Sequence, residues 1–275
     1  MPSNMTQSGN KVHYSLFKGE PGTWKSSAAV TYPGPQYWFS FDGKMNALHI
    51  PMLKHGIDPN SIEFDDYDSW PAARDVMEKM TYGVPGGIKY KTIVLDSVTS
   101  CADYMLREVI QNKTGTNKRS GAEAGKKVGG FSVNEMEDFN AESAGLTELI
   151  ALTKKVHKFH KIDVILIAHV IRTEQKDQSG KVQVARQLVT AGKKPAAKIP
   201  AYCDETYHFG LRTSIDPTAG GEFVILTQNS GDDFARTTLP LNREIKINDV
   251  NFYKDVVLPA ITKQEQSINQ QQPTK

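Results

Sequence analysis

The chain has 275 residues, which is enough for one large α/β domain or for one domain with small additions. Hydrophobic residues make up 39% of the sequence and charged residues 23%, which are ordinary proportions for a soluble globular protein. The formal net charge of +2 does not indicate a nucleic-acid partner, so charge has to be examined segment by segment.

Cysteine use and the absence of targeting signals exclude several classes of protein. Cys101 and Cys203 stand outside any CxxC or Cys/His spacing, which argues against a zinc site and a disulfide framework. So few cysteines fit a reducing compartment, and we expect a cytoplasmic protein. Residues 1–10 lack the basic and apolar regions of a secretory signal. No apolar run approaches the ~18 residues of a membrane span, so we expect no membrane partner.

Strands and helices alternate through the first 170 residues, after a disordered lead-in over residues 1–11. Apolar and aromatic patterns predict strands over 13–18, 37–41, 61–64, 92–95 and 163–168, and helices over 26–31, 70–82, 98–111 and 142–160. The continuous apolar runs at 92–95 and 163–168 are typical of strands that are buried on both faces of a parallel sheet.

The last third of the chain has a different pattern, in which strands cluster. Strands are predicted over 205–212, 223–228 and 235–239, and a helix over 249–261 closes a domain spanning 12–262. The Gln-rich tail, 263–275, is expected to be disordered. The pattern predicts an α/β fold with a mostly parallel central sheet, flanking helices and antiparallel strands at the C-terminal edge.

Residues 19–27, Gly-Glu-Pro-Gly-Thr-Trp-Lys-Ser-Ser, lie between a predicted strand and a predicted helix. The spacing of Gly19, Lys25 and Ser26 matches the phosphate-binding pattern G-x-x-x-x-G-K-[ST]. In such a loop, backbone N–H groups surround the β-phosphate, the lysine reaches the β- and γ-phosphates, and the serine hydroxyl is a Mg²⁺ ligand. The alternative is a Gly/Pro turn with an exposed lysine. The predicted ATP site consists of Gly19, Glu20, Pro21, Gly22, Thr23, Trp24, Lys25, Ser26 and Ser27.

Trp24 departs from the pattern, because it stands where the last glycine normally keeps the loop slim. Its backbone dihedrals must suit a residue with a Cβ atom, and its indole must point away from the nucleotide. The departure leaves open whether the chain hydrolyses ATP or only binds it.

Three polar residues follow predicted strands and join Lys25 as candidate catalytic residues. Asp96 ends the strand TIVLD, where an acid would hold Mg²⁺ together with Ser26, although Asp96 also suits the start of the next helix as an N-cap. Asp42 is placed to orient or deprotonate the attacking water, unless it only forms an Asp-Gly turn. His169 ends the strand DVILIA and would sense the γ-phosphate, or it simply closes the strand.

The segments GEPGTWKSS, FSFDG, TIVLDS and DVILIAH, in this order, resemble the RecA-like recombinases. More closely, they are similar to small phage-encoded RecA-type AAA ATPases associated with single-strand annealing, over about residues 12–230. The resemblance implies a RecA-like P-loop fold, DNA-dependent ATP hydrolysis, assembly into a ring or filament, and a place in the bacterial host cytoplasm. That family usually has glutamate where Asp42 stands, so the role in water activation passes to a side chain shorter by one methylene.

The family also has two DNA-binding loops, and this chain has a basic segment at each corresponding place. Residues 113–131 contain five basic residues against one acidic, and residues 171–198 contain seven against two. Positive charge is therefore concentrated in segments expected to be mobile loops, as binding to a phosphate backbone requires, unless both loops are merely solvated. The candidate DNA-binding residues are Lys113, Lys118, Arg119, Lys126, Lys127, Arg172, Lys176, Lys181 and Arg186.

We therefore expect an ATPase that binds single-stranded DNA in recombination or annealing, with a second copy of itself and a single-strand-binding protein as further candidate partners. One alternative is a non-hydrolysing DNA-binding or annealing protein with a degenerate phosphate loop. The other is a P-loop motor or loader whose basic loops bind protein.

Overall fold

The computed structural model describes residues 12–82, 87–116, 127–128, 131–132, 136–176, 182–190, 193–212, 221–230 and 234–270. Its centre is a sheet of strand order β11-β10-β9-β1-β7-β4-β2-β3, and β8 pairs with β7 outside this path. The strands are β1 (Tyr14–Gly19), β2 (Gln36–Ser40), β3 (Ile62–Asp66), β4 (Thr92–Asp96), β7 (Asp163–Lys176), β8 (Val182–Leu188), β9 (Glu205–Arg212), β10 (Glu222–Leu226) and β11 (Glu244–Lys246). The short strands β5 (Lys127–Val128) and β6 (Phe131–Ser132) pair separately.

The strands from β9 to β3 run parallel, and β10 and β11 continue the sheet in antiparallel directions. The first strand, β1, lies between β7 and β9, so Leu16 is opposite Leu166 on one side and Thr206 on the other. Because parallel strands end at the same edge of a sheet, the residues that follow β1, β2, β4 and β7 meet there. The predicted mostly parallel sheet with antiparallel strands at its C-terminal edge is confirmed.

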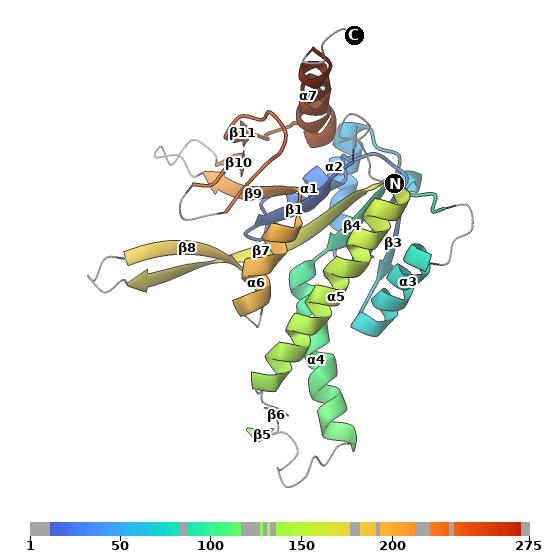
Figure 1. Ribbon diagram of the computed structural model, residues 1–275, viewed down its shortest axis with the longest axis vertical. Coiled ribbons are helices and arrows are strands. Elements are labelled where there is room, and N and C mark those ends of the chain that lie inside the picture. Colours follow the sequence, from blue (N-terminus) through green and yellow to red (C-terminus); the bar gives the residue numbers. More distant parts are fainter. Residues whose placement is uncertain are drawn as a thin grey trace.

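Helices cover both faces of the sheet (Figure 1). One layer consists of α3 (Trp70–Tyr82), α4 (Val98–Thr116), α5 (Met136–His160) and α6 (Lys193–Tyr202). The other consists of α1 (Lys25–Ala29), α2 (His49–His55), the π-helical turn η4 (Phe252–Val257) and α7 (Leu258–Gln270). Short 3₁₀ turns, η2 (Met45–Leu48) and η3 (Pro59–Ser61), flank α2. No helix in the described ranges combines the length and the apolarity that a membrane crossing needs.

The middle positions of β4 and of the first half of β7 are apolar because both faces of these strands are covered. In β4, Ile93 and Leu95 pack into the layer of α3, α4 and α5, whereas Val94 packs into the opposite layer. Leu166 and Ile167 of β7 alternate in the same way. Successive side chains of a strand point to opposite faces, so two covered faces require a continuous apolar run.

The expectation of a long loop over 171–198 is wrong. Strand β7 continues to Lys176 and pairs antiparallel with β8, so that Val170 lies opposite Leu188, and α6 follows from Lys193. Figure 1 shows this ribbon projecting from the body of the domain. A two-stranded projection covers little core and therefore lacks the continuous apolar run by which β4 and the first half of β7 are recognised.

Other boundaries also differ from the prediction, and the predicted strand over 235–239 is only an isolated bridge between Arg236 and Thr206. Helix α4 extends to Thr116, and β5 and β6 lie within the other basic segment; the remainder of 117–135 falls outside the described residues. Helix α7 continues to Gln270, so the expected disorder from residue 263 is wrong as far as residue 270. Lysine, glutamine and glutamate there are good helix formers, which explains the continuation. The predicted lead-in, 1–11, also lies outside the described residues.

Candidate functional site

The predicted phosphate loop connects β1 to α1, as its sequence pattern requires. Gly19 lies so close to β9 that a Cβ atom would be 2.2 Å from the carbonyl oxygen of Phe209, and only glycine fits there. Gly22 has φ +77°, in the left-handed region that glycine adopts without strain. The two glycines thus let the chain turn tightly at the end of the strand.

Trp24 adopts the backbone conformation of the glycine that it replaces, with φ 69° and ψ 14°. Its ring centroid lies 5.5 Å from that of Phe223 on β10, and Lys54 Nζ lies 4.9 Å from the indole centroid. These contacts hold the indole between β10 and α2, so the left-handed turn is kept despite the large side chain. The strain of a non-glycine residue in this region is about 1–2 kcal/mol, and packing of the indole offsets it.

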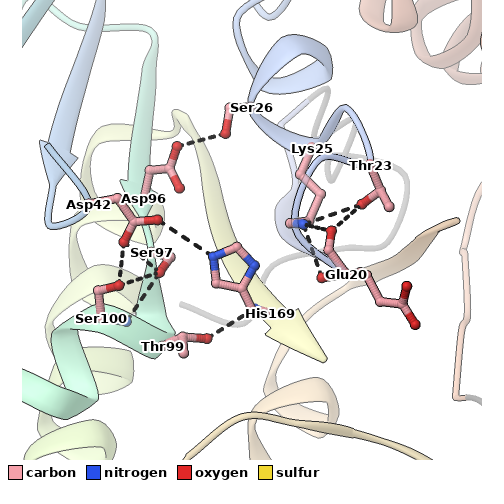
Figure 2. A network of polar contacts seen from close by, with 11 residues as sticks. Glu20, Thr23, Lys25, Ser26, Asp42, Asp96, Ser97, Thr99, Ser100 and His169 are labelled. Carbon is pink, nitrogen blue, oxygen red and sulfur yellow. Dashed lines mark hydrogen bonds and ion pairs between the residues drawn. The ribbon is translucent and has the colours of Figure 1, made fainter. Parts of the chain in front are cut away.

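Lys25 is 4% exposed, and its ammonium group folds back over the loop. Lys25 Nζ donates to the carbonyl oxygens of Gly19 and Glu20, at 3.0 and 2.6 Å, and to Thr23 Oγ1 at 3.3 Å. Figure 2 shows Lys25 turned toward Glu20 and Thr23. Burial lowers the pKa of Lys25 to about 8, although nearby Asp96 and Asp42 act in the opposite direction. Phosphate oxygens entering the loop would compete with these carbonyls for the same ammonium group. Helix α1 has only five residues, so its dipole adds little, and the binding strength must come from Lys25 and the loop N–H groups.

Ser26 lies in α1 and Asp96 ends β4, and their side chains are hydrogen-bonded. Ser26 Oγ donates to Asp96 Oδ2 at 2.7 Å. Burial raises the pKa of the Asp96 carboxyl, Asp42 raises it further, and the bond from Ser26 acts against both. A hydroxyl and a carboxylate oxygen side by side are hard ligands of the kind that Mg²⁺ prefers when phosphates and waters complete its shell. The arrangement therefore fits the predicted metal site.

Asp42 and His169 face each other across the same edge of the sheet. His169 Nε2 lies 3.5 Å from Asp42 Oδ2, and Figure 2 shows the imidazole ring between Asp42 and the phosphate loop. Burial of Asp42 favours its neutral form, but hydrogen bonds from His169, Ser100 and Ser97 together outweigh burial and lower its pKa to about 2. Asp42 is thus an anchored carboxylate anion at neutral pH.

Three hydroxyl groups at the N-terminal end of α4, on Ser97, Thr99 and Ser100, have no predicted role in the site. Ser97 Oγ donates to Asp42 Oδ1 at 3.1 Å, and Ser100 Oγ also donates to this oxygen. The backbone N–H of His169 donates to Thr99 Oγ1 at 2.9 Å. The pattern Ser-x-Thr-Ser directly after a strand-ending aspartate is the signal that was available, but it is also typical of a helix start.

A cleft of about 380 Å³ joins the predicted site residues. Its polar part contains the loop from Pro21 to Ser27 together with Asp42, Asp96 and His169. A second cleft, of about 350 Å³, lies on the other side of Asp42 and His169 and is lined by Ser100, Tyr104 and Arg107. The structure therefore brings together the candidate catalytic and metal-binding residues and the phosphate loop.

None of the predicted DNA-binding residues that the structure describes lines the cleft at the phosphate loop. Lys113 is in α4, Lys127 in β5 and Lys176 in β7, whereas Lys118, Arg119, Lys126 and Lys181 fall outside the described residues. Arg172 and Arg186 occupy opposite positions on the two strands of the ribbon. Arg172 also forms an exposed ion pair of 3.2 Å with Glu174.

Comparison with known proteins agrees with this geometry. A family model described as an AAA domain matches residues 15–239, which include the phosphate loop and the four strand ends. Among solved structures, the chain is similar to one described as the crystal structure of the RadB recombinase. The TM-score is 0.46 and the identity 14%, over 78% of this chain and 79% of that chain. No curated protein matches the chain. Because the family model spans most of its length, the chain belongs to the AAA domain family of P-loop ATPases, and its sheet has the mostly parallel α/β architecture that the sequence predicted.

Proposed function

We propose that this chain is a DNA-dependent ATPase that uses Mg²⁺, binds single-stranded DNA and acts in recombination or strand annealing. The observation that carries the proposal is the convergence of Lys25, Ser26, Asp42, Asp96 and His169 at one edge of the sheet. Phosphoanhydride hydrolysis requires a cation at the phosphates, hard oxygen ligands for the metal and a group that positions the attacking water. The convergent residues supply each of these parts.

Lys25, Ser26 and Asp96 form the part of the site that binds phosphate and metal. Lys25 would exchange its carbonyl contacts for oxygens of the β- and γ-phosphates. Ser26 and Asp96 would hold Mg²⁺, which neutralises the charge that develops on the phosphates during hydrolysis. Their hydrogen bond already places the two oxygens on the same side of the cleft.

Asp42 and His169 form the part of the site that faces the attacking water. A carboxylate with a pKa of about 2 is a weak base, so we assign Asp42 to orienting the water rather than removing its proton. His169 Nδ1 is buried and has no hydrogen-bond partner among the described residues. A contact between this nitrogen and the γ-phosphate would couple nucleotide state to the ribbon, which begins at the next residue.

Single-stranded DNA as the partner is supported by the charge of the β7–β8 ribbon. Arg172 and Arg186 occupy opposite positions on the two strands and concentrate positive charge on one face of the ribbon. A phosphate bound beside them would release counterions. The ribbon therefore offers an anion site that is connected by β7 to the nucleotide cleft.

Assembly of several copies is supported by exposed apolar side chains next to the cleft. Ile50 and Leu53 on α2 are 77% and 79% exposed and lie on the same face of the helix, three positions apart. Helix α2 directly follows Leu48, which lines the cleft. Neighbouring large apolar side chains in contact with water indicate an interaction surface. We propose that a second copy covers this surface, so that ATP lies between subunits of a ring or filament. A single-strand-binding protein as a further partner rests on the family resemblance alone.

The test is ATP hydrolysis with increasing single-stranded DNA, for wild type, Lys25→Ala and Lys246→Ala. Lys246 forms an ion pair with Glu222 on the antiparallel edge of the sheet and serves as the matched control. We expect DNA to stimulate turnover in the wild type and the control. Lys25→Ala should lose at least about a hundredfold, as is typical when one donor to the reacting charge is removed.

Other outcomes would support the alternatives. DNA binding without turnover in any of the three proteins would indicate a non-hydrolysing annealing protein, with Trp24 marking a lost active site. Turnover without salt-sensitive DNA binding would indicate a motor or loader whose basic ribbon binds protein.

A further inference from the structure

Ser97 separates Asp96 from the start of α4, and the hydroxyl groups of Ser97 and Ser100 form a connected set. Ser97 Oγ accepts a hydrogen bond of 3.1 Å from the backbone N–H of Ser100, which is the capping contact of a helix N-terminus. The hydroxyl oxygens of Ser97 and Ser100 lie 3.2 Å apart. Ser97 is fully buried, so its capping contact fixes the place of both hydroxyls relative to β4.

Both hydroxyls converge on the same oxygen of Asp42. Ser97 Oγ and Ser100 Oγ donate to Oδ1, while Oδ2 is the oxygen next to His169 Nε2 (Figure 2). A carboxylate on a single methylene has two side-chain torsions, and bonds to one of its oxygens restrict both of them. Fixing Oδ1 therefore fixes the direction in which Oδ2 points.

Resting on the proposed function of Asp42, we propose that Ser100 and Ser97 are positioning residues that aim Asp42 Oδ2 at the attacking water. The two hydroxyls hold the carboxylate through the oxygen that lies away from His169. Each charge-assisted bond also favours the anion over the neutral acid. The N-terminal end of α4 thus lies between Asp96, which ends β4, and Asp42, whose carboxylate its hydroxyls hold.

Ser100 reaches Asp42 from the side away from the phosphates. It lines the second cleft together with Tyr104 and Arg107, and it does not line the cleft that contains the phosphate loop. Removing its hydroxyl leaves the lining of the nucleotide cleft intact. The capping contact also remains, because it uses the backbone N–H of Ser100 and the hydroxyl of Ser97. Ser100→Ala therefore perturbs the water-facing part of the site without perturbing nucleotide binding or the helix start.

The experiment compares kcat and KM for ATP among wild type, Ser100→Ala, Ser100→Thr and a remote control, Ser267→Ala. The Ser267 hydroxyl bonds to the Lys263 carbonyl oxygen on α7, away from both clefts. Ser100→Ala is expected to lower kcat about tenfold, a part of the 10²–10⁴-fold that a positioned acid–base group contributes, with KM unchanged. Ser100→Thr retains a hydroxyl and is expected to recover most of the loss. Turnover of Ser100→Ala equal to that of Ser267→Ala would overturn the inference.

A double-mutant cycle with Asp42→Asn separates positioning from a general structural effect. If Ser100 acts through Asp42, adding Ser100→Ala to Asp42→Asn lowers kcat no further, because Asp42→Asn has already removed the effect of the Ser100 hydroxyl. An additional tenfold loss in the Asp42→Asn background would show independent action and overturn the inference, while leaving the role of Asp42 intact. Wild-type turnover in Asp42→Asn alone would instead overturn the proposed role of Asp42, and the positioning role with it.

Discussion

Trp24 shows how a phosphate loop tolerates a bulky residue in place of glycine. The backbone keeps the left-handed conformation, and the side chain is accommodated outside the loop by Phe223 and Lys54. Two requirements are thereby separated, because the loop needs the dihedral angles of a glycine but not its lack of a side chain. The cleft still contains the lysine, serine and aspartate to which we assign phosphate and metal binding.

Trp24→Gly should therefore preserve nucleotide binding and reduce stability. Glycine removes left-handed strain of about 1–2 kcal/mol. The change also removes an aromatic contact, a cation–π contact and part of the indole burial, together roughly 2–4 kcal/mol. We expect net destabilisation of about 1 kcal/mol and a Tm lower by about 2–4 °C, measured by thermal unfolding. Phe223→Ala keeps the left-handed backbone strain at Trp24 and removes the aromatic contact with the indole. It should therefore destabilise the fold at least as much as Trp24→Gly does. Loss of ATP binding in Trp24→Gly would mean that the indole itself contacts the nucleotide.

At the scale of elements, β7 performs two tasks with one strand. Its first half lies in the sheet between β1 and β4, and its second half pairs with β8 in the ribbon. His169 lies at the junction, where Thr99 Oγ1 accepts a hydrogen bond from its backbone N–H. A change in the nucleotide cleft is thus connected to the ribbon through a continuous hydrogen-bonded strand rather than through a flexible connection.

The ribbon prediction is tested by the salt dependence of DNA binding. Arg172→Ala and Arg186→Ala should each weaken binding to single-stranded DNA and reduce the slope of log K against log salt by about 1. Fluorescence anisotropy with a labelled oligothymidine between low and moderate salt measures both effects. Arg212→Ala, in which an exposed arginine paired with Glu244 is removed from the sheet, is the control. Unchanged slopes in both ribbon variants would place the DNA elsewhere.

The sequence predicts elements well where burial on a sheet or helix face dictates a regular apolar pattern. The bounds of α3 and β9 agree with the expected ranges, and β4 differs by one residue. The second half of β7 and all of β8 were missed, because a projecting ribbon has no core to pattern its side chains. The phosphate loop, Asp96 and Asp42 were found from spacing and strand ends. Ser100 was not predicted as a site residue, because its hydroxyl contacts Asp42 only if β2 lies beside β4. The order of strands in the sheet shows this neighbourhood, whereas the sequence alone does not.

At the scale of the whole molecule, the two ends of the sheet differ in chemistry. The carboxyl end holds the nucleotide cleft, and the amino end buries Asp163 at the start of β7. Asp163 Oδ1 accepts a hydrogen bond of 2.8 Å from the backbone N–H of His13, which ties β7 to the residue before β1. Burial raises the pKa of Asp163 to about 7, although the bond from His13 acts to lower it. The acid is therefore largely neutral below this pH.

This raised pKa predicts a pH-dependent stability. Because the folded state holds the proton more tightly than the unfolded state, the contribution of Asp163 is fully present below about pH 4. It is lost as the pH rises through about 7. Asp163→Asn retains the acceptor for the His13 N–H and cannot ionise. Its Tm should therefore exceed that of the wild type increasingly between about pH 4 and pH 7, and remain higher above that range. Asp68 is exposed, and the Tm of Asp68→Asn should equal that of the wild type at every pH. A difference in Tm between Asp163→Asn and the wild type that stays constant with pH would contradict the raised pKa of Asp163.

The tryptophan in the phosphate loop also provides an intrinsic fluorescence signal from the site. Of the three tryptophans, Trp38 and Trp70 are buried, with 0% and 8% of their surface exposed, whereas Trp24 is only partly covered and lines the nucleotide cleft. A water-soluble quencher reaches Trp24 before the other two. Occupancy of the cleft thus becomes a change in intrinsic emission, and the unmodified protein carries its own optical reporter for ligand titrations and stopped-flow kinetics.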